Sequence, residues 1–400
     1  MSELLLVGVG QMGRPYLDAA LRIGCTVRAV ESRAGFPGLP AGTGADFYEV
    51  GNALDETWLL GALEASGKGP LDGVVAFAEA HVTAAALVQD RLRLPGPSLH
   101  AATISRNKGL QRMSCAARGV AQPEFRLVPS LADAREWMAE RLPVVVKPLT
   151  FGGSVGVEQV STPVELDSAV ERRNEGKLLV ERAVSGPEFS WEALVGDGSV
   201  LFENVTAKET TEAPYFVELT HRCGHRFEDP EAARQVRDFT RLVLDTIGMR
   251  TGLVHLEFRM SADGPVLMEV AVRTPGDHIA EAIGLTYGFD LYEGVVRLAL
   301  GLPLDDLVRS GPERFAAVHF PDCPPGRITG IDGLPEVAEH PFVRRIALTR
   351  GVGDVVPPLR SSSARVGHAL IVAPSPEERE ETLEFVRTRL RIATVPVTDS

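Results

Sequence analysis

Short apolar runs alternate with segments that carry an apolar residue at every third or fourth position along the first hundred residues. Leu4–Val9 and Gly73–Phe77 are such runs and predict buried strands. Glu56–Ala65 and Ala80–Arg91 have the spacing of helices with one apolar face. Strands that alternate with helices are typical of a parallel sheet, so we predict a first α/β domain. The breaker-rich segment Arg93–Ser98 predicts its end near residue 98.

A second, smaller α/β lobe is predicted from residue 99 to residue 185. His100–Ala117 has helical spacing, and Ser130 is a favourable N-cap for a helix over Leu131–Arg141. Val144–Val146 is a β-branched run that predicts a strand buried on both faces, and Lys177–Arg182 predicts another strand.

Two hairpins dominate the pattern between residues 186 and 312. Each is predicted from alternating strands around an Asp-Gly turn, namely Phe189–Val195 with Val200–Ala207, and Thr251–Arg259 with Pro265–Val272. The segment 209–229 between them shows little regularity, and we interpret it as a long functional loop. From residue 313 onwards, strand-like pieces alternate with Pro and Gly turns, and Ser375-Pro376 begins a final helix. We therefore expect a C-terminal α+β subdomain over residues 313–400.

Composition indicates a soluble globular protein with several domains. The chain has 400 residues, of which 44% are hydrophobic and 24% charged, and its net charge is −13. This charge argues against nucleic acid or an anionic membrane as the main partner. The four cysteines lie far apart, so neither a disulfide framework nor a paired metal site is indicated. The N-terminus shows no leader pattern and no apolar run reaches membrane-spanning length, so we expect a cytoplasmic protein.

The most informative stretch is PVVVKPLTFGGSVGV, residues 143–157. Lys147 stands at the end of the predicted strand, and Gly152, Gly153 and Ser154 belong to the loop that follows. Successive glycines let backbone N–H groups converge on one anion, and the lysine adds a positive charge, so the stretch predicts a phosphate site. Because the lysine precedes the glycines, the pattern differs from a Walker loop. The alternative is a glycine-rich hairpin with a solvated lysine.

A pair of glutamates predicts a metal site. Glu257 and Glu269 lie on the two strands of the second hairpin, where they can face each other as cross-strand neighbours. A hard cation such as Mg²⁺ takes one or two carboxylates and completes its shell with phosphate oxygens and water. Arg273 follows at the strand end and suits a phosphoryl group or a substrate carboxylate. The alternative is a surface hairpin, but both glutamates sit within apolar runs, where an unpartnered carboxylate is rare.

The N-terminal motif GVGQMG points to a different chemistry. Gly8, Gly10 and Gly13 satisfy the dinucleotide fingerprint, and Glu31 stands about where a ribose would be held. A tight strand-to-helix turn with close packing also needs glycines, so the motif alone does not decide between the two. An NAD(P)-dependent oxidoreductase therefore remains an alternative function.

Taken together, these residues resemble the ATP-grasp superfamily over most of the chain. The resemblance divides the chain into a Rossmann-like pre-ATP-grasp domain (1–98), a small lobe (99–185), a large lobe with the metal site (186–312) and the C-terminal α+β subdomain (313–400). It implies that Lys108 and Lys147 contact the α- and β-phosphates of ATP while Gly152, Gly153 and Ser154 cover the β- and γ-phosphates. It also implies roles for Glu181 at the adenine amino group, for the backbone of Ala183 and Val184 at the ring edge, for Glu188 at the ribose, and for Glu257 and Glu269 as ligands of Mg²⁺ or Mn²⁺.

One departure and two further segments refine the resemblance. The superfamily often has asparagine two residues after the second glutamate, whereas this chain has Ala271, so a metal ligand is missing or replaced by water. The run EVAVRTPGDHI, which contains Arg273, and the segment FVELTHR are similar to bacterial L-amino acid ligases that make dipeptides. In that branch a histidine at the place of His221 lies by the reacting carboxyl group. Cys223 between His221 and His225 also raises the alternative of a zinc site.

The resemblance implies an ATP-dependent carboxylate–amine ligase. Such an enzyme forms an acyl phosphate and then an amide, and it releases ADP and phosphate. The expected partners are small carboxylates and amines, amino acids above all, and a second copy in a homodimer. Because acyl phosphates hydrolyse, we expect lids at 151–157 and 209–229. On this interpretation GVGQMG is a structural turn. A nucleotide-binding protein without turnover is a third alternative, which Ala271 keeps open.

Overall fold

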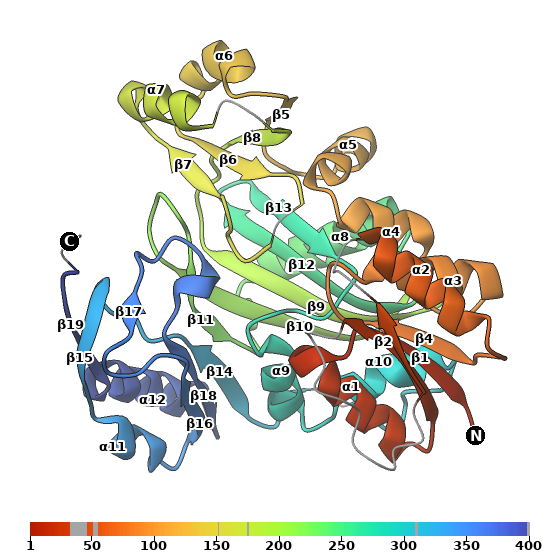
Figure 1. Cartoon of the computed structure of the whole chain (residues 1–400). Helices are drawn as coiled ribbons and strands as arrows, with labels where there is room; N and C mark the ends of the chain where they lie inside the picture. The colour runs from red at the N-terminus through yellow and green to blue at the C-terminus, as the bar shows by residue number, and fades with distance from the viewer. Residues whose placement is uncertain (33–45, 51–54, 151, 174–175, 309–310, 398–400) are drawn as a thin grey trace.

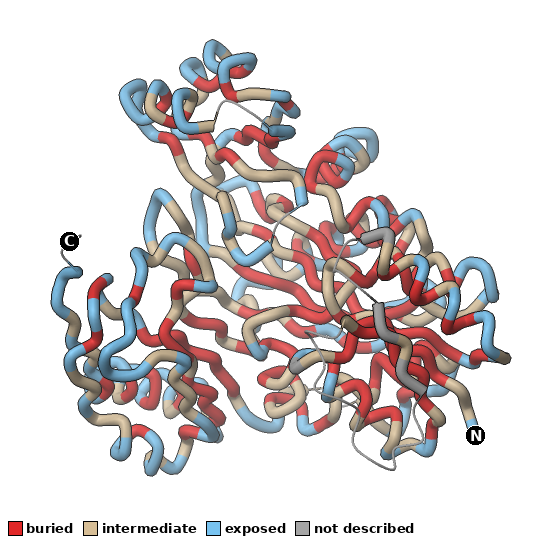
Figure 2. Tube along the Cα trace, viewed as in Figure 1, coloured by how far each residue is buried: buried red, intermediate tan, exposed pale blue. Residues whose placement is uncertain are grey.

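A computed structural model describes residues 1–32, 46–50, 55–150, 152–173, 176–308 and 311–397. The described residues form four sheets, and the largest lies at the centre of the molecule (Figure 1). The N-terminal sheet and the C-terminal part flank this central sheet, and a small lobe stands above it (Figure 1). Buried residues concentrate in the central and N-terminal sheets, whereas the outer faces of the small lobe and the C-terminal part are exposed (Figure 2).

The N-terminal sheet has the predicted parallel α/β architecture, with strand order β3-β2-β1-β4. Its strands are β1 (Glu3–Val7), β2 (Thr26–Ser32), β3 (Asp46–Val50) and β4 (Gly73–Ala76), and its helices are α1 (Gly10–Arg22), α2 (Asp55–Ser66) and α3 (Val82–Leu92).

The glycines of GVGQMG serve close packing between β1 and α1. A Cβ atom on Gly8 would lie 2.2 Å from the imidazole of His81, and one on Gly13 would lie 2.5 Å from the ring of Phe77. Glu31 is 4% exposed, and its carboxylate accepts a hydrogen bond of 2.6 Å from the N–H of Val9. The residue expected at a ribose therefore stabilises the turn, which favours the structural interpretation of the motif.

The small lobe is a four-stranded antiparallel sheet of order β5-β8-β6-β7, and one apolar cluster joins this sheet to α6 and α7. Its elements are β5 (Phe125–Val128), η1 (Ala132–Ala134), α6 (Arg135–Ala139), β6 (Val144–Pro148), β7 (Glu158–Val160), α7 (Pro163–Arg172) and β8 (Leu178–Arg182). The helices α4 (Leu99–Ser105) and α5 (Lys108–Arg118) precede this sheet in the chain and pack on α8 (Pro230–Ile247).

Three predictions for this lobe were wrong in detail. The single helix His100–Ala117 is two helices, because the side chain of Asn107 accepts a hydrogen bond of 3.1 Å from the N–H of Leu110 and starts α5. Lys108 thereby becomes the first residue of a helix. The helix over Leu131–Arg141 is shorter and begins as the 3₁₀ turn η1. Val145 in β6 is only half-buried, since it faces a pocket between the two lobes.

The central sheet has eight strands in the order β13-β12-β9-β10-β11-β14-β18-β16, all paired antiparallel. They are β9 (Glu188–Gly196), β10 (Ser199–Thr210), β11 (Glu218–Arg222), β12 (Gly252–Ser261), β13 (Gly264–Ala271), β14 (Phe315–His319), β16 (Val343–Leu348) and β18 (Gly367–Ala373). The helices α8 (Pro230–Ile247), α9 (Ile279–Tyr287) and α10 (Leu291–Ala299) accompany them, and α9 was not predicted.

Strand β9 shows how this sheet separates its apolar face from its polar face. Its residues Phe189, Trp191, Ala193 and Val195 pack in one apolar cluster with residues of α8. Glu188, Ser190 and Glu192 alternate with them and therefore point to the opposite face. Both predicted hairpins of the large lobe are present, and this opposite face carries the polar residues described below.

The prediction of a long loop over 209–229 was wrong. Strand β10 continues to Thr210, and β11 lies between β10 and β14 inside the central sheet. The segment lacks apolar alternation because its inward-facing positions, such as His221, carry polar side chains. The connections 211–217 and 223–229 are the parts of the predicted loop that lie outside strands and helices.

The C-terminal part extends the central sheet with β14, β16 and β18 and adds a three-stranded sheet of order β17-β15-β19. This second sheet consists of β15 (Gly326–Asp332), β17 (Val355–Val356) and β19 (Arg391–Val395), and it is accompanied by α11 (Leu334–Ala338), η2 (Ser362–Ala364) and α12 (Pro376–Arg389). Ser375 caps α12, as predicted. Among the described helices, none combines the length and the apolar character needed to cross a membrane.

The packing role of Gly8 gives a stability prediction. Gly8 and Gly24 both have φ above +80°, but only a Cβ on Gly8 would meet a buried side chain. His81 has little room to move, because it packs on Trp58 and Phe77. We expect Gly8→Ala to lower the free energy of unfolding by at least about 2 kcal/mol more than Gly24→Ala. Urea unfolding followed by circular dichroism measures the difference, and equal losses would contradict the packing argument.

Candidate active site

A pocket of about 130 Å³ lies between the small lobe and the polar face of the central sheet. Eleven of the thirteen predicted site residues line it: Lys108, Lys147, Gly152, Gly153, Ser154, Glu181, Val184, Glu188, Glu257, Glu269 and Arg273. Two wider hollows of about 830 and 920 Å³ lie elsewhere and contain none of the predicted site residues. The convergence of predicted residues rather than size therefore distinguishes the candidate site. Phe151, in the glycine loop, lies outside the described residues.

In the small lobe, the charges centre on Glu181. The Nζ of Lys147 lies 2.6 Å from one oxygen of this carboxylate, and the guanidinium of Arg112 contacts the other. Glu181 is 1% exposed, and burial by itself would raise its pKa, but the two cations outweigh burial and lower the pKa to about 2. Arg112 also donates to the carbonyl of Met268 at 2.7 Å and so connects the small lobe to β13. The carboxylate is therefore ionised and held in place.

The two predicted metal ligands face each other, as expected. Glu257 and Glu269 are direct partners in the register of β12 and β13. The Nζ of Lys108 lies 2.9 Å from Glu269, so the first residue of α5 supplies a positive charge to this pair. Ala271 is 1% exposed and is the register partner of His255. The small residue thus lies opposite an imidazole in the neighbouring strand.

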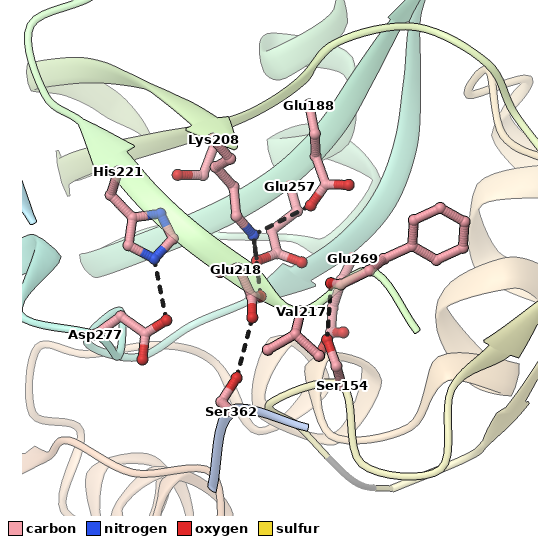
Figure 3. Close-up of polar contacts among 12 residues, drawn as sticks. Ser154, Glu188, Lys208, Val217, Glu218, His221, Glu257, Glu269, Asp277 and Ser362 are labelled. Atoms are coloured by element: carbon pink, nitrogen blue, oxygen red, sulfur yellow. Dashed lines mark hydrogen bonds and ion pairs between the residues drawn. The ribbon is translucent and has the colours of Figure 1, made fainter. Parts of the chain in front are cut away.

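Sequence analysis missed Lys208, which has the most carboxylate contacts in the site. Its side chain is 1% exposed, and its Nζ lies 2.6 Å from Glu257, 3.2 Å from Glu188 and 3.5 Å from Glu218 (Figure 3). Burial by itself would lower the pKa of Lys208, but the three carboxylates raise it well above its ordinary value. One lysine therefore balances three acidic groups from β9, β11 and β12.

His255 was also missed, and it connects Glu257 to a second buried carboxylate. Its Nδ1 lies 3.0 Å from Glu192 and its Nε2 lies 3.3 Å from Glu257. Burial opposes protonation, but hydrogen bonds to the two carboxylates raise the pKa of His255 to about 8. Glu192 is fully buried and accepts further hydrogen bonds from Ser190, Asn204 and Thr206.

On the other side of the pocket, Arg273 and His221 have different surroundings. The Nε of Arg273 lies 2.9 Å from Glu79, which follows β4 in the N-terminal sheet. His221 is 1% exposed, does not line the pocket, and forms a 3.0 Å hydrogen bond through Nε2 to Asp277 (Figure 3). Arg273 lines the pocket and is within reach of a ligand, whereas neither His221 nor its partner Asp277 lines it.

Two further predictions concern Ala183 and a zinc site. Ala183 does not line the pocket, and its N–H donates to the carbonyl of Pro143 at 3.0 Å, so its contact with the adenine ring edge stays a prediction. The zinc alternative was wrong: Cys223 is buried against the hydroxyl of Thr206, and the described residues contain no group of three metal-binding side chains.

Comparison with known proteins agrees with this geometry. Residues 140–281 match the ATP-grasp domain, and residues 319–395 match the L-amino acid ligase C-terminal domain 2. The L-arginine-specific L-amino acid ligase of Bacillus subtilis is 20% identical over 85% of this chain and 84% of its own length. A formate-dependent phosphoribosylglycinamide formyltransferase of Flavobacterium psychrophilum is 27% identical over 76% of this chain and 79% of its own length. The crystal structure of an L-amino acid ligase from Bacillus licheniformis superposes with a TM-score of 0.82 at 24% identity and covers 99% of both chains.

The chain therefore has the ATP-grasp fold and contains an ATP-grasp domain, as the resemblance implied. Its C-terminal part is similar to the second C-terminal domain of L-amino acid ligases.

The charge balance at Lys208 gives a second prediction. Lys208→Met leaves three half-buried carboxylates without their shared cation, which we expect to lower the free energy of unfolding by about 3 kcal/mol at pH 8. Burial by itself would raise the pKa of Glu257, but Lys208 and His255 hold it well below its ordinary value, so removal of the lysine raises this pKa and lets Glu257 bind a proton more readily at low pH. The loss of unfolding free energy relative to wild type should therefore be smaller at pH 5 than at pH 8.

Thermal unfolding of the nucleotide-free protein at both pH values measures this loss. Lys68→Met is the matched control, because Lys68 is an exposed lysine that pairs only weakly, at 3.9 Å, with Glu64. A loss at Lys208 that does not depend on pH would contradict the charge argument.

Proposed function

We propose that this protein joins the carboxyl group of one amino acid to the amino group of another, in a reaction driven by ATP. The observation that carries the proposal is that Lys108 and Lys147 form ion pairs with glutamates of the two facing lobes. Lys108 pairs with Glu269 and Lys147 with Glu181, beside the glycine loop. This arrangement offers cations for phosphates and carboxylates for a metal in one pocket. The match of the C-terminal part to an L-amino acid ligase domain supports amino acids as substrates.

ATP would occupy the pocket between the lobes. Lys108 and Lys147 would contact the α- and β-phosphates, and Gly152, Gly153 and Ser154 would cover the β- and γ-phosphates. Toward the other end of the nucleotide, Glu181 would accept from the adenine amino group, Val184 would face the ring edge and Glu188 would hold the ribose. Phosphate would compete with Glu269 for Lys108, so nucleotide binding would release that glutamate for another cation.

The donor set fits a hard divalent cation such as Mg²⁺. Glu257 and Glu269 are opposed carboxylates, no cysteine is among the described residues that line the pocket, and Mg²⁺ takes few carboxylates together with phosphate oxygens. The metal would supply positive charge to the phosphoryl group that is transferred. His255 and Lys208 would hold Glu257 in a fixed orientation.

The reaction would proceed in two steps. The carboxylate of the first amino acid attacks the γ-phosphorus of ATP, which gives an acyl phosphate and ADP. The amine of the second amino acid then attacks the acyl carbon, and phosphate leaves as the amide forms. Arg273 carries a fixed charge for the phosphoryl group or the substrate carboxylate. His221 is buried and hydrogen-bonded to Asp277, so it would help to orient the bound substrate through that carboxylate.

The first functional prediction concerns the metal. Glu269→Gln keeps the size of the side chain but loses its charge, so turnover should fall on the order of a hundredfold or more. Glu381→Gln, on the exposed face of α12, should keep wild-type activity. Phosphate release with ATP, Mg²⁺ and a panel of amino acids measures both variants, and circular dichroism checks their folding. Equal activity would mean that the hairpin is only structural.

The second functional prediction separates activation from amide formation. Hydroxylamine traps an acyl phosphate as a hydroxamate, so it reports the first step without the natural amine. We expect Arg273→Ala to lose the hydroxamate signal on the order of a hundredfold. His221→Ala should keep much of it and lose amide product. Both variants should still bind ATP, and Arg118→Ala, on the exposed side of α5, serves as a control. A wild-type protein that forms no hydroxamate with any amino acid would refute the acyl-phosphate mechanism.

A further inference from the structure

A short segment of the C-terminal part, residues 361–365, reaches the candidate site. It contains the 3₁₀ turn η2, and it contacts the glycine loop, strand β11 and the connection that precedes α9. No residue of this segment was selected by sequence analysis. Its contacts come from both backbone and side-chain atoms, and they join parts of the site that are far apart in the chain.

Ser362 makes two of these contacts. Its backbone N–H donates to the carbonyl of Gly153 at 3.2 Å, and its hydroxyl donates to Glu218 at 3.0 Å (Figure 3). On the glycine loop itself, the hydroxyl of Ser154 donates to the carbonyl of Phe216 at 3.4 Å. The loop proposed to cover the phosphates is therefore held from two directions, by the 211–217 connection and by the C-terminal part.

Arg365 anchors the same segment to the substrate side. Its guanidinium forms a two-point ion pair with Asp277, and its Nε donates to the carbonyl of Ser362 at 3.0 Å. It also lies 3.6 Å from the centre of the Phe320 ring, and its side chain is 11% exposed. The same carboxylate of Asp277 bonds His221. Arg365 thus holds both η2 and the Asp277–His221 pair.

The backbone at this anchor is strained. Asp277 and His278 have φ values of 56° and 60°, in the left-handed region that residues other than glycine rarely adopt. Such conformations persist where the surroundings hold them, and they gather at functional sites. The two-point contact from Arg365 is one of the interactions that hold Asp277 in this conformation.

We propose that Ser362 and Arg365 are positioning residues of the ligase reaction, through which the C-terminal part keeps the glycine loop and the substrate-side carboxylates closed over the acyl phosphate. This inference rests on the proposed function. An acyl phosphate that meets water in place of the amine is hydrolysed: water adds to the acyl carbon, the bond to the phosphate oxygen breaks, and the carboxylate and phosphate are released. ATP is then consumed without an amide, so a closed site is needed for coupling.

Phosphate released per amide formed therefore tests the role of the segment. Ser362→Ala removes the hydroxyl contact with Glu218. Ser362→Pro also removes the N–H that donates to Gly153, and the extended backbone of Ser361 (φ −162°, ψ 164°) is compatible with a following proline. Ser361→Ala is the matched control, since the Ser361 hydroxyl contacts that of Ser363 and not the site.

In the wild-type protein, with ATP, Mg²⁺ and the amino acids that give amide, we expect close to one phosphate per amide. Ser362→Ala should raise this ratio at least about fivefold, because its hydroxyl bonds a charged group. Ser362→Pro should raise it further, and Arg365→Lys, which loses the two-point contact, should raise it as well. Ser361→Ala should keep the wild-type ratio. Thermal unfolding of each variant shows whether it is folded, and the ratio is independent of how much folded enzyme is present.

The outcomes are distinguishable. A wild-type protein that forms neither hydroxamate nor amide would refute the proposed function, and this inference with it. A wild-type protein that forms amide, together with Ser362 and Arg365 variants that keep one phosphate per amide, would overturn this inference alone. Variants that unfold at lower temperature but retain that ratio would show that the segment only stabilises the fold, which also overturns it.

Discussion

Charge neutralisation between the two lobes is the constraint on which the rest of the site depends. The pocket gathers carboxylates from β8, β9, β11, β12 and β13 in a space with little solvent, where unpaired like charges strongly destabilise one another. Lys108, Lys147 and Lys208 meet these carboxylates at 2.6 to 3.5 Å. Lys108 and Lys147 line the pocket, whereas Lys208 is buried beneath it. The same ion pairs thus fix the positions of the acidic side chains and of the cations that face the pocket.

The fold supplies these charges by simple geometric rules. Alternation along β9 sends its aromatic residues into the core with α8, and Glu188 on the opposite face lines the pocket. The register of β12 and β13 sets Glu257 opposite Glu269. The Asn107 cap starts α5 at Lys108, so a helix boundary fixes the position of a phosphate-binding candidate. The alternation of side chains along the strands, the strand register and the helix cap thus determine both the packing of the core and the positions of the charged residues.

Much of this site was predictable, because its motifs are local in the chain. Lys147 lies next to its glycine loop, and an Asp-Gly turn aligns the two glutamates. Lys208, Arg112 and His255 were not predictable in this way. Each is a single charged residue in a strand or helix, and Lys208 and Glu257 are 49 positions apart. Strand β11 was taken for a loop because its polar residues face a polar site. This obscures the alternation of apolar and polar residues that identifies a strand.

The pairing of β11 with β14 has a consequence for how such proteins can be recombined. The C-terminal part adds its strands to the central sheet, so the two share one hydrogen-bonded layer rather than a linker. If this part were cut away, β11 would become an open edge whose unpaired N–H and C=O groups invite association with other chains. Chimeras that graft a different C-terminal module must therefore provide a strand in the register of β14. The boundary between modules is a row of hydrogen bonds, and it limits which modules are interchangeable.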